Sequence, residues 1–120
     1  MIETQNPKRY DLEDRTLKYG KRIIRMLKEL PTNNINLVLT NQVLRSGTSM
    51  GANYREANET ETKKDFKYRL RICRKEGKET IYWLKLIINA SKDYTKRIEA
   101  LLGETYELAK IFVSILKKCD

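Results

Sequence analysis

The side chains available for chemistry are limited in type, because the chain contains no histidine. Without imidazole, nucleophilic triads and histidine-based metal sites are excluded. Ser46 and Ser49 have no such base to activate them, and Cys73 and Cys119 are too few and too far apart for a structural zinc site. We therefore predict no enzyme activity, no metal site and no other cofactor.

Glu76 and Glu79 leave carboxylate chemistry as a further possibility, since helical spacing places them on the same side as Trp83. Di-iron carboxylate bundles usually need a Glu-x-x-His motif, which this chain lacks. In the alternative, structural role, Arg45 pairs with Glu76, Glu79 or Glu56, because a buried carboxylate without a partner is costly. The sequence favours the structural role.

A stripe of small polar side chains recurs in steps of four and three residues. It consists of Gln42, Ser46, Ser49, Asn53 and Glu56. Solvated helical faces more often carry lysine and glutamate, so this stripe indicates a close, partly buried contact with paired hydrogen bonds. Gly47 and Gly51 also indicate close approach, because glycine within a helix costs up to about 1 kcal/mol relative to alanine. A frayed, exposed helix is the alternative.

Positive charge is the strongest compositional signal: 25 Lys and Arg against 16 Asp and Glu give a net charge of +9 and a pI of about 9.6. Such an excess favours a polyanionic partner. The candidate nucleic-acid-binding residues form two runs at helical spacing, Lys18, Lys21, Arg22, Arg25 and Lys28, then Lys64, Lys67, Arg71, Arg74, Lys75 and Lys78. Lys85 and Tyr82 continue the second run. These stripes suit phosphate contacts with weak sequence specificity, although solvated faces are the alternative.

Helices must position these residues. Breaks rich in Pro, Asn, Thr or Ser leave four segments, at residues 11–29, 35–56, 63–90 and 96–120. Each segment repeats apolar or small side chains every three or four residues, which predicts an amphipathic helix, and Thr62 resembles a helix cap three residues before Asp65. The short connections predict an all-α, antiparallel up-down-up-down four-helix bundle over residues 11–120, after a polar tail at residues 1–10.

The predicted buried faces follow from the same spacing. They are Leu12, Thr16, Tyr19, Ile23, Met26 and Leu30; Leu39, Val43, Gly47, Met50, Tyr54 and Ala57; Phe66, Leu70, Cys73, Gly77, Thr80, Leu84 and Ile87; and Ile98, Leu101, Thr105, Leu108, Phe112, Ile115 and Cys119. The polar N-terminal residues, two free thiols and absence of a long apolar run predict a cytoplasmic protein that does not span a membrane.

The stretch from residue 42 to 57, Gln-Val-Leu-Arg-Ser-Gly-Thr-Ser-Met-Gly-Ala-Asn-Tyr-Arg-Glu-Ala, resembles the signature of a bacterial family. This family comprises four-helix bundle proteins encoded by intervening sequences within 23S rRNA genes, often labelled S23 ribosomal protein. The accessory variability determinant of diversity-generating retroelements belongs to the same group. Further matches are Leu30-Pro31, Lys64-Asp65-Phe66 and residues 76–84, so the resemblance runs from about residue 12 to residue 117.

The resemblance implies a four-helix bundle that assembles as a ring-like homopentamer. In the retroelement member, the assembly binds nucleic acid and contacts a reverse transcriptase. The resemblance also implies a structural or interfacial role for the motif positions, which are Arg45, Ser46, Ser49, Asn53, Glu56, Asp65, Phe66, Glu76, Glu79 and Trp83. Amphipathic rings suited to subunit contacts, or to the edges of the bundle, are Tyr10, Tyr19, Tyr54, Tyr82 and Tyr106.

Two hypotheses about function follow. The first is a non-enzymatic protein that binds RNA or an RNA–DNA hybrid through phosphate contacts. The second is an oligomeric scaffold for a protein partner, such as a reverse transcriptase, without a nucleic-acid role of its own.

Overall fold

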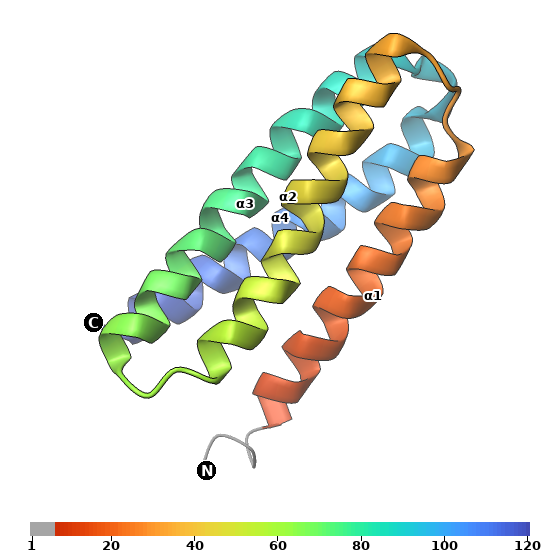
Figure 1. The fold of residues 1–120 in the computed structure, drawn as a ribbon. Helices are drawn as coiled ribbons and strands as arrows, with labels where there is room; N and C mark the ends of the chain where they lie inside the picture. The colour runs from red at the N-terminus through yellow and green to blue at the C-terminus, as the bar shows by residue number, and fades with distance from the viewer. Residues whose placement is uncertain (1–6) are drawn as a thin grey trace.

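The computed structural model describes residues 7–120, with side chains described from residue 11 onward. The helices are α1 (Pro7–Glu29), α2 (Asn34–Asn58), α3 (Lys63–Ala90) and α4 (Thr95–Lys118), and a 3₁₀ helix, η2 (Lys92–Tyr94), precedes α4 (Figure 1). No strand occurs within this range. The prediction of an all-α protein with four helices is confirmed.

Helices α2 and α3 begin where a side chain accepts a hydrogen bond from one of their free N–H groups. The Asn33 side chain accepts a hydrogen bond of 2.8 Å from the Asn36 N–H, and the Thr62 hydroxyl accepts one of 3.1 Å from the Asp65 N–H. Helix α1 begins at Pro7, a residue suited to a first helical position, so residues 7–10 belong to the helix rather than to the expected tail. The remainder of that tail lies outside the described residues.

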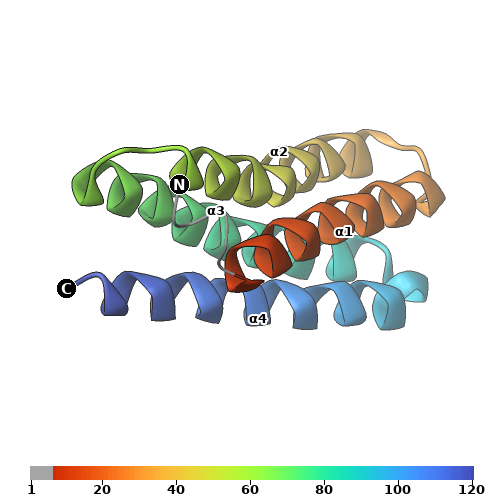
Figure 2. The same cartoon turned by 90° about the horizontal axis from the view of Figure 1, so that it is seen from below.

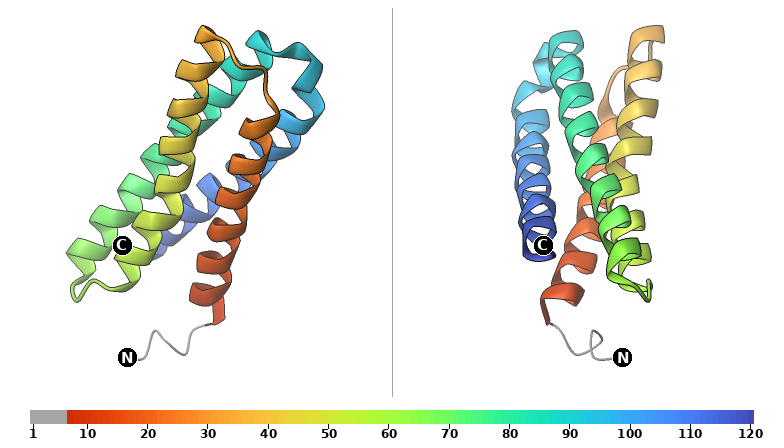
Figure 3. Two further views of the ribbon diagram at one scale, coloured as in Figure 1. Left: turned by 45° about the vertical axis from the view of Figure 1, so that its right-hand side comes forward. Right: turned by 90° about the vertical axis from the view of Figure 1, so that its left-hand side faces the viewer.

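Each helix runs antiparallel to the one before it, in the predicted up-down-up-down order (Figures 1 and 2). Helix α3 packs between α2 and α4, and α1 packs against the same two helices from the opposite corner (Figure 3). The bundle measures 47 × 21 × 19 Å. Consequently α1 and α3 expose their outer faces in different directions, and the two predicted cationic runs cannot form one continuous surface.

The interior consists of the predicted helical faces. All the predicted residues of α1 are buried, as are most of those on α2, α3 and α4. Near the helix ends, Leu39, Phe66, Ile115 and Cys119 are only half-buried, and Leu116 is buried beside Ile115. The Tyr19 hydroxyl forms a buried hydrogen bond with the Thr105 hydroxyl. Burial raises the pKa of Tyr19, so its hydroxyl remains protonated.

Two glycines of α2 allow α1 to pack closely. A Cβ atom at position 47 would lie 2.2 Å from Ile23 Cδ1, and one at position 51 would lie 2.9 Å from Thr16 Oγ1. Close approach at Gly47 and Gly51 is therefore confirmed, and a frayed, exposed helix is excluded.

Candidate nucleic-acid interface and the supporting motif

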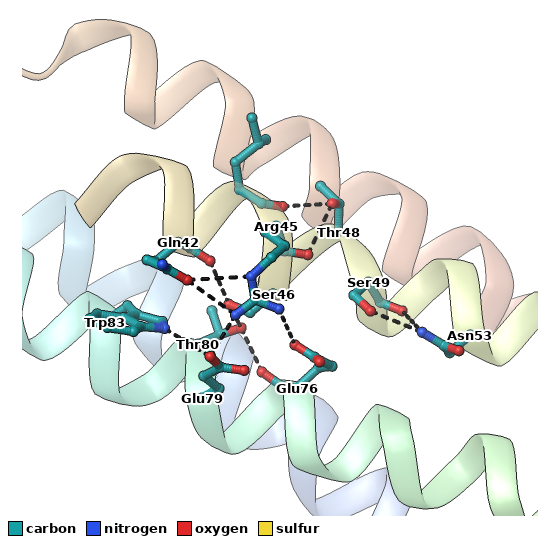
Figure 4. A network of polar contacts seen from close by, with 11 residues as sticks. Gln42, Arg45, Ser46, Thr48, Ser49, Asn53, Glu76, Glu79, Thr80 and Trp83 are labelled. Carbon is teal, nitrogen blue, oxygen red and sulfur yellow. Dashed lines mark hydrogen bonds and ion pairs between the residues drawn. The ribbon is translucent and has the colours of Figure 1, made fainter. Parts of the chain in front are cut away.

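The family-like motif joins α2 to α3 through a charged network (Figure 4). The Arg45 guanidinium lies 3.2 Å from a Glu76 carboxylate oxygen and 2.5 Å from a Glu79 oxygen. It also donates to the Gln42 side-chain carbonyl at 3.2 and 3.3 Å. Glu76 is buried, so Arg45 supplies the partner that a buried carboxylate requires. The predicted pairing with Glu76 and Glu79 is confirmed, whereas Glu56 is exposed and takes no part.

Hydroxyl and amide groups extend this contact along both helices. Thr80 Oγ1 lies 2.7 Å from Ser46 Oγ, and both side chains are fully buried. Farther along, the Asn53 amide donates to the Ser49 carbonyl and hydroxyl at 2.9 Å, and its oxygen accepts a 3.0 Å hydrogen bond from Arg69. Four of the five residues of the polar stripe, all except Glu56, thus make the paired hydrogen bonds that their types predicted.

The remaining motif residues have local structural roles. Phe66 and Trp83 are half-buried against the core, and the Trp83 indole N–H lies 3.4 Å from a Glu79 oxygen. Asp65 is exposed in the first turn of α3, where the positive end of the helix favours a carboxylate. We refer to the whole contact, from Gln42 and Trp83 at one end to Asn53 and Arg69 at the other, as the α2/α3 seam.

The other side of α3 faces α4 across an open groove of about 530 Å³. Its walls are cationic and its floor is apolar. Helix α3 contributes Arg74, Lys78 and Ile81, and α4 contributes Tyr106, Ala109, Lys110, Val113 and Lys117. We call this the α3/α4 groove. Lys110 and Lys117 were not among the predicted binding residues, although their spacing of seven residues and the antiparallel order of the helices could have placed them beside α3.

A second hollow of about 390 Å³ lies farther toward the N-terminus of α3. Lys64, Lys67 and Arg71 line it together with Cys119 and Asp120. Lys67 forms an ion pair with Asp120, and this contact lowers the pKa of that carboxyl. The cationic row of α3 therefore runs along α4 through both hollows, whereas Lys75 is exposed and lines neither.

Several cations of the α3/α4 groove lack an acidic partner within the part of the chain whose side chains are described. Among the residues the structure describes, Arg74, Lys78 and Lys117 form no ion pair, and the Lys110 ammonium lies 3.6 Å from Glu107. Lys85 lies above Tyr106, with 5.8 Å between its ammonium nitrogen and the ring centroid. The groove thus combines uncompensated positive charge with an accessible aromatic ring.

The cationic run of α1 is exposed, and Lys18 is its one member with an ion pair among the described residues. The run consists of Lys18, Lys21, Arg22, Arg25 and Lys28. Lys18 is 3.1 Å from Asp14, and the neighbouring Arg15 donates two 2.8 Å hydrogen bonds to Glu104 of α4. These bonds lower the pKa of Glu104. Lys21, Arg25 and Lys28 form no ion pair among the described residues, so this run differs from the α3/α4 groove by its position in the fold rather than by pairing.

The tyrosines differ in what they can contact. Tyr19 and Tyr54 are buried inside the bundle, so their proposed role in subunit contacts is wrong for this fold. Tyr82 and Tyr106 are exposed. The side chain of Tyr10 lies outside the described residues.

Within residues 7–120, no group of three His, Cys, Asp or Glu side chains is placed to hold a metal ion. None of the helices in this range combines the length and apolar composition needed to cross a bilayer. Cys73 and Cys119 are free thiols, and burial raises the pKa of Cys73 to about 12.

Together these features define an all-α, up-down-up-down bundle with one closed polar seam and one open cationic groove. The chain belongs to the 23S rRNA-intervening sequence protein family, whose model matches residues 8–114. This confirms the family that the motif from residue 42 to 57 predicted.

A solved structure supports the same assignment. It is the 1.70 Å crystal structure of a protein of unknown function from the S23 ribosomal protein family of Bacteroides thetaiotaomicron. The two proteins share 37% sequence identity, and the match covers 88% of this chain and 98% of the other, with a TM-score of 0.81. Among functionally curated proteins, none matches the chain.

Proposed function

We propose that this protein is a non-enzymatic, cytoplasmic, homo-oligomeric protein that binds RNA or an RNA–DNA hybrid through phosphate contacts along α3 and α4. The observation that carries this proposal is the α3/α4 groove, in which Arg74, Lys78 and Lys117 lack acidic partners among the described residues. Uncompensated cations attract phosphates and release the counterions bound to the nucleic acid. The free thiols of Cys73 and Cys119 support a reducing compartment.

Salt dependence tests this proposal. Fluorescence anisotropy of labelled RNA, measured from about 50 to 300 mM KCl, is expected to show a steep loss of affinity, because each phosphate neutralised adds about 0.7 to 0.9 to the slope of log K against log salt. Absence of binding by the wild-type protein at the lowest salt would refute the proposal.

A charge-matched pair of triple variants then locates the surface. The groove variant Arg74→Gln/Lys78→Gln/Lys117→Gln is expected to bind at least tenfold more weakly, with the salt slope reduced by about 2 to 3. The control, Lys21→Gln/Arg25→Gln/Lys28→Gln on α1, removes the same charge and is expected to lose less than threefold. Equal losses in both variants would mean that net charge, rather than the groove, determines binding.

The proposed homo-oligomer is supported by exposed apolar side chains along α1 and α2. Leu17 and Ile24 of α1, and Leu37, Val38 and Leu44 of α2, are each at least 39% exposed. Gly20, between the two α1 residues, faces Thr48 of α2, one turn from Leu44, so these side chains follow a common side of the bundle. Contiguous exposed apolar side chains commonly mark protein interfaces.

Light scattering coupled to size exclusion tests the assembly. A homopentamer would have a mass of about 71 kDa, five times the 14.2 kDa of one chain. The variant Leu17→Ser/Ile24→Ser/Leu44→Ser is expected to elute as a smaller species, whereas Tyr82→Ser, which removes an exposed ring from α3, should not change the mass. A monomeric wild-type protein at micromolar concentration would refute the oligomer.

The alternative function is a scaffold that binds a protein such as a reverse transcriptase. The apolar side of α1 and α2 favours it, because this surface lies away from the α3/α4 groove. Replacing Lys67, Arg71, Arg74 and Lys78 with glutamine separates the hypotheses. A scaffold would retain its protein partner after these changes, whereas a nucleic-acid-binding protein would lose its ligand.

A further inference from the structure

We propose that the α3/α4 groove selects single-stranded over double-stranded nucleic acid, by stacking unpaired bases on the ring of Tyr106. This inference rests on the proposed function and adds the class of nucleic acid and the residue that distinguishes it.

The composition of the groove is the first reason. Phosphate contacts alone require cations on an exposed surface, yet Ile81, Ala109 and Val113 form an apolar floor between the cationic walls. A duplex keeps its base faces stacked inside and presents phosphates and base edges, so it would contact the walls and leave the floor uncovered. An unpaired strand can turn its apolar base faces toward this floor.

The position of Tyr106 is the second reason. Its side chain lines the groove and remains 40% exposed. Lys85 lies over one face of the ring, so a base would stack on the opposite face. Aromatic rings set within a cationic groove are how proteins bind single strands with little sequence preference.

The spacing of the cations is the third reason. Lys67, Arg71, Arg74 and Lys78 recur about once per helical turn, or about every 5.4 Å along α3. This repeat is comparable with the distance between successive phosphates of an extended single strand. The row continues from the α3/α4 groove into the hollow lined by Lys64, so a strand of several nucleotides can follow it.

An acidic amphipathic helix from a protein partner would also match cationic walls and an apolar floor. The cations that repeat about once per turn along α3 favour a strand with a phosphate at every residue over a helix whose carboxylates are scattered among other side chains. We therefore argue for the single strand, and binding of a peptide by charge alone becomes an outcome of the test.

The test compares an unstructured labelled oligouridylate with an RNA duplex of the same length at one salt concentration. Wild-type protein is expected to bind the single strand at least tenfold more tightly. Tyr106→Ala should lower single-strand affinity about tenfold and leave duplex affinity within twofold, while Tyr106→Phe retains stacking and binds as wild type. Tyr82→Ala, which removes an exposed ring of α3 outside the groove, should change neither affinity.

Circular dichroism of each variant checks that the helices are intact, and Tyr106→Phe shows whether the ring itself is needed. Equal duplex and single-strand affinity in the wild type, or equal losses of both in Tyr106→Ala, would overturn the inference while leaving phosphate binding intact. Displacement of the strand by polyglutamate at equal charge concentration would also overturn it, because the groove would then respond to charge alone. Absence of binding to any of these ligands at low salt would instead refute the proposed function.

Discussion

Helix α3 directs charged side chains toward both of its neighbours, and the two sets differ in how they are paired among the described residues. In the α2/α3 seam, Glu76 and Glu79 are paired with Arg45. In the α3/α4 groove, Arg74 and Lys78 have no acidic partner among the described residues. The difference separates charges that hold the fold together from charges that remain available to a ligand.

Burial explains why the two sides differ. A carboxylate that loses water must gain a cation and hydrogen bonds, so Glu76 fixes where Arg45 lies. Lysine and arginine beside an open groove keep their hydration, so leaving them unpaired costs little. A phosphate can then bind without first displacing an acidic side chain.

The largest expected effect on stability is in the α2/α3 seam. Arg45→Ala should lower the free energy of unfolding by about 2–4 kcal/mol, because it leaves Glu76 buried without a cation. RNA affinity should stay within twofold, since Arg45 lies away from the α3/α4 groove. Urea unfolding measures the first quantity and anisotropy the second.

The control is the same substitution in a Glu76→Gln background, where Arg45→Ala should cost at most about half as much. A cost below about 0.5 kcal/mol in the wild-type background would mean that the α2/α3 seam does not depend on this pairing. Lys110→Ala, which removes an exposed pair with Glu107, should itself change stability by less than about 0.5 kcal/mol.

The reaction rates of the two cysteines test the same contrast between the buried α2 side of α3 and its accessible α4 side. Cys73 is buried with its thiol 3.4 Å from the Met50 carbonyl, whereas half-buried Cys119 lines the hollow beside Lys67. Iodoacetamide at pH 8 should modify Cys119 at least about 100-fold faster than Cys73, because Cys73 has a pKa of about 12 and must be exposed by local unfolding. Peptide mass spectrometry over a time course measures both rates. Comparable rates would show that the α2 side of α3 opens readily.

Two glycines allow the stability of a close helix contact to be compared with that of an open helix surface. Gly51→Ala should destabilise the protein by about 1–3 kcal/mol, because the added methyl would meet the stiff, buried Thr16 side chain. Gly103→Ala places a methyl where no atom lies within 4 Å, and should stabilise α4 by about 0.5–1 kcal/mol through helix propensity. Thermal unfolding of both variants gives the comparison. A stabilised Gly51→Ala would mean that α1 does not pack closely at this position.

Helix α4 shows the same contrast between its own sides, since Glu104 is paired with Arg15 of α1, whereas Lys117 forms no ion pair with any side chain that the structure describes. The Arg15 hydrogen bond lowers the pKa of Glu104 in the folded protein. The pair therefore stabilises the fold fully above the pKa of an unfolded glutamate, about 4.3, and this stabilisation is lost as the pH falls through the lower pKa of the folded state. Glu104→Gln should therefore destabilise by less than about 1 kcal/mol at pH 7, and the difference should shrink by pH 3. Urea unfolding at both pH values measures it.

Local patterns in the sequence predicted the helices, because side chains such as Ile23 and Leu84 repeat with the helical period and Thr62 signals a helix start. The pairing of Arg45 with Glu76 was also predictable, since matching polar stripes on two successive helices imply contact. The exclusion of Glu56 was predictable as well, because eleven residues of one helix hold it about 16 Å along the axis from Arg45, too far for an ion pair.

The α3/α4 groove was less accessible to sequence reasoning. Helix α4 carries five cations against three acidic residues, but four of the cations lie in its end turns, so α4 shows no basic stripe that would single out Lys110 and Lys117. Their significance depends on α4 lying antiparallel to α3, which is a property of the tertiary fold. Conversely, the stripe on α1 is conspicuous in the sequence, but the fold places it beside Glu104 and at the opposite corner from α3.

The smallest expected effect on stability comes from the groove itself. The variant Arg74→Gln/Lys78→Gln/Lys117→Gln lowers the net charge from +9 to +6 and removes no ion pair among the described residues. Its free energy of unfolding should therefore change by less than about 0.5 kcal/mol. Any change should be an increase, because repulsion between cations is reduced. Urea unfolding at low salt, where repulsion between cations is least screened, gives the most sensitive measurement. A loss above about 1 kcal/mol would mean that these cations support the bundle, and the separation between structural and available charge on α3 would fail. Because Arg45→Ala is expected to do the reverse, weakening the fold and sparing RNA binding, the two variants measured together distinguish a groove kept for a ligand from a bundle that is merely basic.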